Sequence, residues 1–161
     1  MARLEERPPA PTLDHPAVRI AIVCSGFHRG ITEALLDGAH ERLSAAGLSE
    51  GHLDIRWVPG AYEAPFAAKT LARTGRYAGI IALGAVVRGA TAHFDHVCYA
   101  ASQGLIQVSL DTGVPCTFGI LTCDTAAQAW ERAGGAVGNA GGDAADAVVS
   151  LINLAAAVRA G

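Results

Sequence analysis

Short apolar runs recur along the chain and alternate with longer segments in which apolar and polar positions mix. The run AGIIALGAVV at 78–87 is nearly all apolar, as expected for a central parallel strand covered on both faces. VRIAIVCS at 18–25 is short and rich in β-branched residues, which is typical of a buried strand. In LDIRWV at 53–58, apolar and polar residues alternate, as in a strand with one buried face. VPCTFGILTC at 114–123 is again mostly apolar. These four runs are the predicted strands.

The segments between the runs place their apolar residues at helical spacing. Pro65 falls in the first turn of one such segment, where proline is tolerated, and Asp124 or Thr125 can cap another. The GNAGG run at 138–142 is expected to separate the last two helices. The predicted helices span 31–47, 62–75, 94–113, 124–134 and 143–161.

Alternation of strands and helices favours right-handed crossovers and a parallel sheet. We therefore expect an α/β protein with a flavodoxin-like three-layer α/β/α sandwich and a four-stranded parallel sheet. Residues 18–161 form one predicted domain, and residues 1–17 form a proline-rich N-terminal arm. Two interpretations of the arm remain open: a disordered tail, or a segment that docks on a neighbouring subunit.

Composition narrows the classes of function. The formal net charge is −3, so the 161 residues carry no basic excess to neutralise nucleic-acid phosphates. None of Cys24, Cys98, Cys116 and Cys123 forms a C-x-x-C pair, which argues against zinc and favours free thiols. The N-terminus lacks an apolar signal core, and no apolar stretch free of glycine and charge could cross a bilayer. A cytoplasmic location is expected.

Ligands of open parallel sheets bind beyond the carboxyl ends of the strands. Four predicted loops leave those ends, at 25–30, 59–63, 88–95 and 122–125. They contain neither a G-x-G-x-x-G fingerprint nor a Walker A motif, so the sequence lacks the usual motifs for binding a dinucleotide or a nucleoside triphosphate.

The first two loops offer an aromatic ring and a carboxylate. Phe27, in the glycine-flanked SGFHRG loop, could stack on a planar ligand or cap the core. Glu63, in VPGAYE, could bind a polyol or a heterocyclic amide. It could equally be an acidic residue that favours a helix N-terminus.

The third loop, within GAVVRGATAHFDHV at 84–97, offers groups for phosphate binding and proton transfer. Ala90 and Thr91 can present N–H groups and a hydroxyl to a phosphate. His93 can transfer protons near neutral pH, although a loop histidine is more often a plain polar residue. Arg132, further along, suits a bidentate phosphate clamp or an exposed helical surface.

Four segments in order resemble the lumazine synthase family, from about residue 18 to the C-terminus. They are VPGAYEAP (58–65), GAVVRGATAHFDHV (84–97), FGILTCDTAAQAWERAG (118–134) and GNAGGDAA (138–145). The resemblance implies the penultimate step of riboflavin biosynthesis. There, 5-amino-6-(D-ribitylamino)uracil condenses with 3,4-dihydroxy-2-butanone 4-phosphate to give 6,7-dimethyl-8-ribityllumazine, phosphate and water.

The resemblance also implies roles by position. His93 would be the catalytic proton shuttle. The residues implied to bind the pyrimidine and its ribityl chain are Phe27, Ala61, Tyr62, Glu63, Ala85, Val86, Val87 and Phe118, the last from an adjacent subunit. Those implied to bind phosphate are Ala90, Thr91 and Arg132. No metal and no organic cofactor is expected.

Several positions depart from the family pattern. Ala136 and Ala140 stand where the family carries lysines, Asp143 stands for a glutamate, and GFH at 26–28 replaces RFN. Fewer cations near a phosphate would weaken substrate binding, so a non-catalytic lumazine- or flavin-binding or shell-forming homologue is the alternative. A generic FMN protein is disfavoured, because no hydroxyl-rich loop follows the first strand.

Assembly is implied by the resemblance as well. Family sites lie between subunits of a homopentamer, and some members form an icosahedral shell of twelve pentamers. The turn at 138–142 is short and lacks the insertion found in members that stay pentameric, so a shell is permitted. A pentamer, a decamer and a 60-subunit shell all remain open. The resemblance leaves room for association with riboflavin synthase, and the N-terminal arm would add an edge strand to a neighbour.

Overall fold

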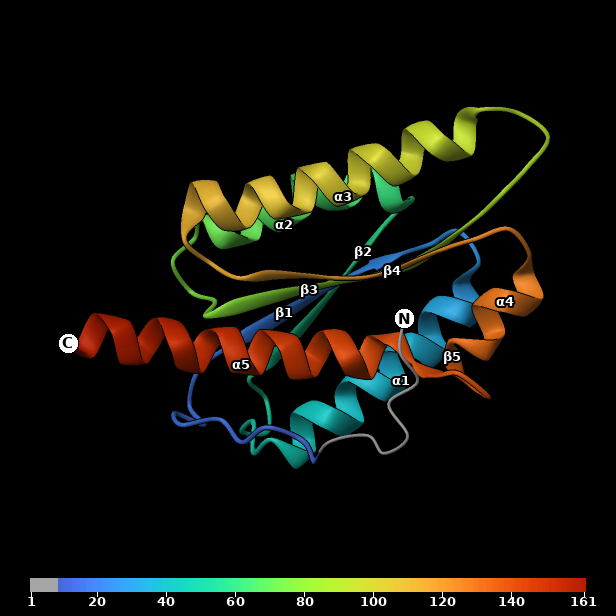
Figure 1. The fold of residues 1–161 in the computed structure, drawn as a ribbon. Helices are drawn as coiled ribbons and strands as arrows, with labels where there is room; N and C mark the ends of the chain where they lie inside the picture. The colour runs from blue at the N-terminus through green and yellow to red at the C-terminus, as the bar shows by residue number, and fades with distance from the viewer. Residues whose placement is uncertain (1–8) are drawn as a thin grey trace.

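Strands and helices alternate through most of the chain, as the apolar pattern predicts (Figure 1). The computed structural model describes residues 9–161, and part of the predicted arm, residues 1–8, lies outside the described residues. The elements are β1 (Ile20–Ser25), α1 (Arg29–Ala45), β2 (Leu53–Val58), the 3-10 turn η1 (Ala61–Glu63), α2 (Ala64–Ala72), β3 (Gly79–Val87), α3 (His93–Thr112), β4 (Cys116–Cys123), α4 (Ala126–Glu131), β5 (Ala133–Gly135), β6 (Gly138–Asn139) and α5 (Ala140–Ala160).

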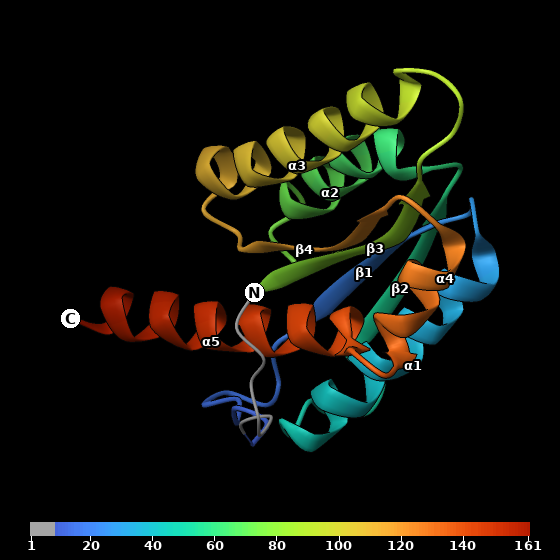
Figure 2. The same cartoon turned by 45° about the vertical axis from the view of Figure 1, so that its right-hand side comes forward.

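The main sheet is parallel and has the strand order β2-β1-β3-β4. Helices α1 and α5 cover one face, and α2 and α3 cover the other (Figures 1 and 2). The predicted three-layer α/β/α sandwich with a four-stranded parallel sheet is thus confirmed.

Strand β3 shows why a central strand is apolar along its whole length. Ile81 and Leu83 belong to the core formed with α1 and α5. Ile80 and Ala82, which alternate with them, belong to the core formed with α2 and α3. Since successive side chains of a strand point to opposite faces, neither face of β3 can carry polar residues.

The region after β4 differs from the prediction. The helix that begins after the Thr125 cap ends at Glu131 instead of 134, and a short antiparallel hairpin, β5–β6, follows. The predicted break at 138–142 extends only to Asn139. Residues 140–142 are helical because the Asn139 side chain accepts hydrogen bonds from the amides of Gly141 (2.9 Å) and Gly142 (3.2 Å).

The glycines of this break are needed inside the helix. A Cβ atom on Gly141 would collide with the carbonyl oxygen of Leu35 in α1. Asn139 also donates a hydrogen bond to the carbonyl of Ala34 (3.0 Å). Local sequence predicts a break, but close packing of α5 on α1 makes glycine the suitable residue.

Asn139 is expected to contribute measurably to stability. We predict that Asn139→Ala lowers the free energy of unfolding by about 1–2 kcal/mol, because the cap of α5 is lost. Asn139→Asp is the matched control: it keeps the accepting oxygen and loses only the bond to Ala34, so its cost should be smaller. Urea denaturation of the two variants checks this, and an alanine variant as stable as the parent would contradict it.

Part of the predicted arm packs against its own chain. Leu13 is buried, and its amide donates to the carbonyl of Ala46 (2.9 Å). Asn153 of α5 accepts from the amide of Asp14 (3.0 Å) and donates to the carbonyl of Thr12 (2.8 Å). Residues 12–14 are therefore tied to α1 and α5 of the same chain.

Helix α5 is the one described helix that is long and apolar enough to cross a bilayer by length and composition alone. It packs against α1 and β4 and buries Val148, Val149 and Ile152. A helix that forms part of a core passes the same test, so this is weak evidence for a membrane span.

Candidate functional site

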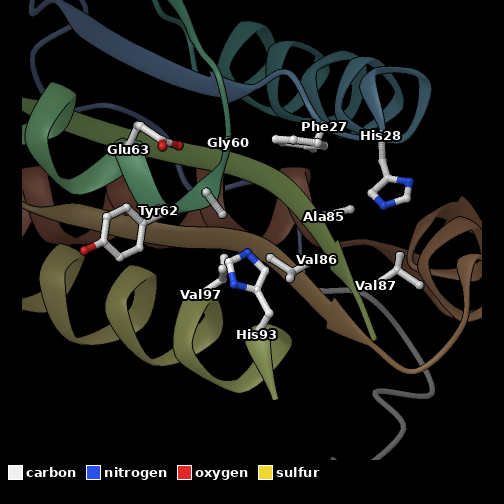
Figure 3. Close-up of a pocket in the computed structure, with 11 residues that line it drawn as sticks. Phe27, His28, Gly60, Tyr62, Glu63, Ala85, Val86, Val87, His93 and Val97 are labelled. Carbon is white, nitrogen blue, oxygen red and sulfur yellow. The ribbon is translucent and has the colours of Figure 1, made fainter. Parts of the chain in front are cut away.

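A cavity of about 380 Å³ opens at the carboxyl ends of β1, β2 and β3 (Figure 3). It lies where ligands of open parallel sheets bind. Its lining residues are Phe27, His28, Gly60, Ala61, Tyr62, Glu63, Ala85, Val86, Val87, His93 and Val97.

The cavity brings together most of the predicted site residues. Those that line it are Phe27, Ala61, Tyr62, Glu63, Ala85, Val86, Val87 and His93. Those that do not line it are Ala90, Thr91, Phe118 and Arg132. Sequence reasoning missed His28 as a lining residue, although it follows Phe27 in the same loop.

Phe27 is available to a ligand. Its side chain is 68% exposed, so it does not cap the core. Because Gly60 has no side chain, the Phe27 ring and the Glu63 carboxylate can both lie close to it. A Cβ atom on Gly60 would lie 3.0 Å from the Phe27 ring and 3.2 Å from Glu63 Oε2. The ring and the carboxylate therefore share one wall of the cavity.

Glu63 is not used as a helix cap. It occupies the N-cap position of α2, but its side chain makes no capping hydrogen bond. Figure 3 shows the carboxylate turned toward the cavity. Of the two sequence interpretations, this geometry favours a carboxylate that is available to a ligand. A carboxylate there can accept hydrogen bonds from N–H or hydroxyl groups.

His93 is the first residue of α3, and its imidazole points into the cavity (Figure 3). Its backbone amide donates to Thr91 Oγ1 (3.3 Å), which fixes the turn just before the helix. The residue is exposed to solvent. An imidazole in this position can take up and release protons at a bound ligand.

Arg88 holds the loop that contains Ala90 and Thr91. Its Nε donates to Asp124 Oδ1 (2.8 Å), and its Nη1 lies 3.5 Å from Asp95 Oδ1. Its guanidinium also lies 4.4 Å from the centre of the Phe94 ring. The loop before α3 is thereby joined both to the end of β4 and to the first turn of α3.

Arg132 and Phe118 lie elsewhere in the chain. Arg132 donates to the carbonyl of Gln128 (3.0 Å) and lines a separate cavity of about 400 Å³ together with Arg88 and Asp124. Phe118 is on β4, at the edge of the sheet, and is 44% exposed. Among residues 9–161, aromatic rings, a carboxylate and imidazoles line the first cavity, but no guanidinium does.

The four cysteines are free thiols, and none of them lines the first cavity. Burial raises the pKa of both Cys24 and Cys116 to about 12. Among residues 9–161 there is no group of three or more histidine, cysteine, aspartate or glutamate side chains that could hold a metal ion. The carboxylate, imidazoles and aromatic rings that line the cavity can bind a ligand and transfer protons.

A family model described as 6,7-dimethyl-8-ribityllumazine synthase matches residues 17–156. Because the match covers most of the chain, the chain belongs to this family. The match indicates lumazine synthase function, which is a transferase activity of riboflavin biosynthesis.

Proposed function

We propose that this member of the lumazine synthase family condenses 5-amino-6-(D-ribitylamino)uracil with 3,4-dihydroxy-2-butanone 4-phosphate, in the penultimate step of riboflavin biosynthesis. Phosphate and water leave, and 6,7-dimethyl-8-ribityllumazine forms. The observation that carries the proposal is the cavity, in which exposed Phe27, Glu63 and His93 converge at the carboxyl edge of the sheet.

The uracil substrate fits the wall formed by Phe27 and Glu63. The exposed Phe27 ring stacks on the pyrimidine, and the small and branched side chains of 85–87 form the floor beneath it. The Glu63 carboxylate accepts hydrogen bonds from the ribityl hydroxyls or the ring edge, and Ala61 and Tyr62 border the same region. Such a pocket, mostly apolar with a few polar groups, is typical of small-molecule sites.

The reaction needs proton transfer but no protein nucleophile. The substrate amine attacks the ketone, and water leaves as the imine forms. Phosphate is then eliminated, and the ribityl-bearing amine attacks the remaining carbonyl group, so that ring closure releases a second molecule of water. His93 is placed to move protons at these steps. Holding the two substrates together supplies a further large part of the rate, up to roughly 7–11 kcal/mol of the barrier.

A second copy of the chain completes the site in this proposal. Arg132 and Phe118 lie outside the cavity of their own chain, and Phe118 is exposed on an edge strand. In a cyclic homopentamer, each copy presents one such surface to the cavity of its neighbour. Arg132 of the neighbour then clamps the phosphate together with the amides and hydroxyl of Ala90 and Thr91.

The test is an assay of the purified protein with both substrates, followed by lumazine absorbance. Product formation is the expected result. The departures at Ala136 and Ala140, in and after the β5–β6 turn, favour the alternative of a non-catalytic binder. That alternative predicts binding of lumazine or riboflavin by calorimetry without product, even at high enzyme concentration. Such an outcome would overturn the proposal.

A further inference from the structure

We propose that His28 is a substrate-binding residue of the cavity and that its imidazole binds the phosphate group of the phosphorylated substrate. This inference deepens the proposed function and rests on it. It begins from an unusual backbone conformation and continues through the position of the side chain and the distribution of charge in the cavity.

His28 adopts a left-handed conformation, with φ 53° and ψ 49°, just before α1. Within residues 9–161 it is the only residue other than glycine with a positive φ. L-residues avoid this region because of steric strain, which glycine does not suffer. A strained position next to a cavity is a reason to look for a functional side chain.

The side chain is not explained by the start of the helix. The carbonyl of His28 accepts from the amides of Ile31 (2.9 Å) and Thr32 (3.2 Å), but its imidazole makes no capping hydrogen bond. The ring lines the cavity instead. Glycine would adopt this conformation without the strain, so the imidazole is better explained by a ligand than by the fold.

The imidazole lies at a defined end of the cavity. Figure 3 shows it on the Val87 side, where β3 ends, and shows Tyr62 and Glu63 on the opposite side. The loop of Ala90 and Thr91, which is proposed to bind phosphate, begins directly after β3. His28 thus lies at the end of the cavity where the phosphate is expected.

The charge distribution supports the same assignment. No lysine or arginine is among the described residues that line the cavity, and Glu63 repels an anion from the opposite end. Arg29, the cation next to His28 in sequence, is directed away: it pairs with Glu33 (2.8 Å) and lies over Trp57 (4.3 Å). The His28 imidazole can donate a hydrogen bond from a ring N–H group to a phosphate oxygen.

Two imidazoles in one cavity then have separate tasks. His93, on α3, moves protons at the reacting carbon atoms, while His28, on the loop after β1, holds the phosphate until it leaves. Within the chain itself, His28 supplies a hydrogen-bond donor to a cavity that has no lysine or arginine among its described lining residues.

The experiment compares His28→Gly with the parent protein by steady-state kinetics. Glycine suits the left-handed conformation, so the variant removes the imidazole without adding strain. The KM for the butanone phosphate should rise roughly 10–100-fold, as expected for a lost hydrogen bond to a charged group. The KM for the uracil substrate should stay within about twofold of the parent value. The fall in kcat should be smaller than the rise in KM for the butanone phosphate.

Arg29→Ala is the matched control, because it removes the neighbouring cation that is directed away from the cavity. Its KM for the butanone phosphate should change less than about threefold, as expected for an exposed charge. Competitive inhibition by inorganic phosphate should weaken in His28→Gly and persist in Arg29→Ala. An unchanged KM and unchanged phosphate inhibition in His28→Gly would overturn the inference, as would equal losses for both substrates.

A direct binding measurement separates this inference from the proposed function. If the parent protein forms no product, the proposed function fails, but calorimetric titration with inorganic phosphate still tests His28. Weaker phosphate binding by His28→Gly than by the parent supports the inference, and equal binding overturns it. Thermal unfolding of His28→Gly, expected at or above the parent temperature because strain is relieved, shows that the fold is retained.

Discussion

Alanine in place of His93 is expected to lower kcat by roughly 10²–10⁴-fold, the range for a lost general acid–base group. His93 is the residue at the start of α3 whose imidazole points into the cavity. Imine formation, phosphate elimination and ring closure all depend on proton transfer, for which the His93 imidazole is placed in the cavity. Steady-state turnover with both substrates saturating, followed by lumazine absorbance, measures the effect.

The control for this variant is His96→Ala. His96 lies on the same helix and is exposed, but it does not line the cavity, so its removal should leave turnover within about twofold of the parent. Calorimetric binding of the lumazine product should survive in His93→Ala, since Phe27 and Glu63 are untouched. A His93→Ala variant with parental turnover would exclude His93 from the mechanism.

Much of the fold and part of the site could be predicted from the sequence, because both follow from strand patterning. An apolar run such as 78–87, rich in β-branched residues, fits a strand covered on both faces, and the intervening helices favour parallel order. Parallel order places the loops after β1, β2 and β3 at one edge. Phe27, Glu63 and His93, from three separate loops, were therefore expected to lie close together, and one cavity contains all three.

The region between 132 and 142 could not be predicted, because its conformation is determined by tertiary contacts. A run with several glycines is a poor helix former on its own. Here Asn139 caps α5 and binds the carbonyl of Ala34, and Gly141 fits against the backbone of Leu35. These partners belong to α1, about a hundred residues earlier in the chain, so no local pattern contains the information.

His28 was missed for a related reason. The sequence shows a histidine in a glycine-flanked loop, but not the left-handed backbone that precedes α1. The resemblance assigns Phe118 to the site of an adjacent subunit, but motif order does not show whether Arg132 meets the cavity of its own chain. The structure adds that β4 lies at the sheet edge with Phe118 exposed on it, where a neighbouring copy can reach it.

A mixture of two inactive variants is expected to recover activity if the site is shared between copies. His93→Ala lacks the proton shuttle, and Arg132→Ala should lose roughly 10²–10³-fold in kcat when the phosphate clamp is removed. In a ring assembled from equal amounts of both chains, some interfaces pair an intact His93 with an intact Arg132. Random assembly makes about a quarter of the sites complete in a cyclic homo-oligomer. Coexpression, or dissociation and reassembly, followed by the lumazine assay measures this recovery.

The control mixture combines His93→Ala with Glu63→Ala. Both residues line the cavity of the same chain, so no arrangement of these two variants restores a complete site, and activity should stay at the level of the single variants. Recovery in the first mixture and not in the second assigns His93 and Glu63 to one copy and Arg132 to its neighbour. If neither mixture recovers although both assemble, His93 and Arg132 act within one chain. That result would require the chain to move Arg132 from its bond with Gln128 into the cavity that it does not line here.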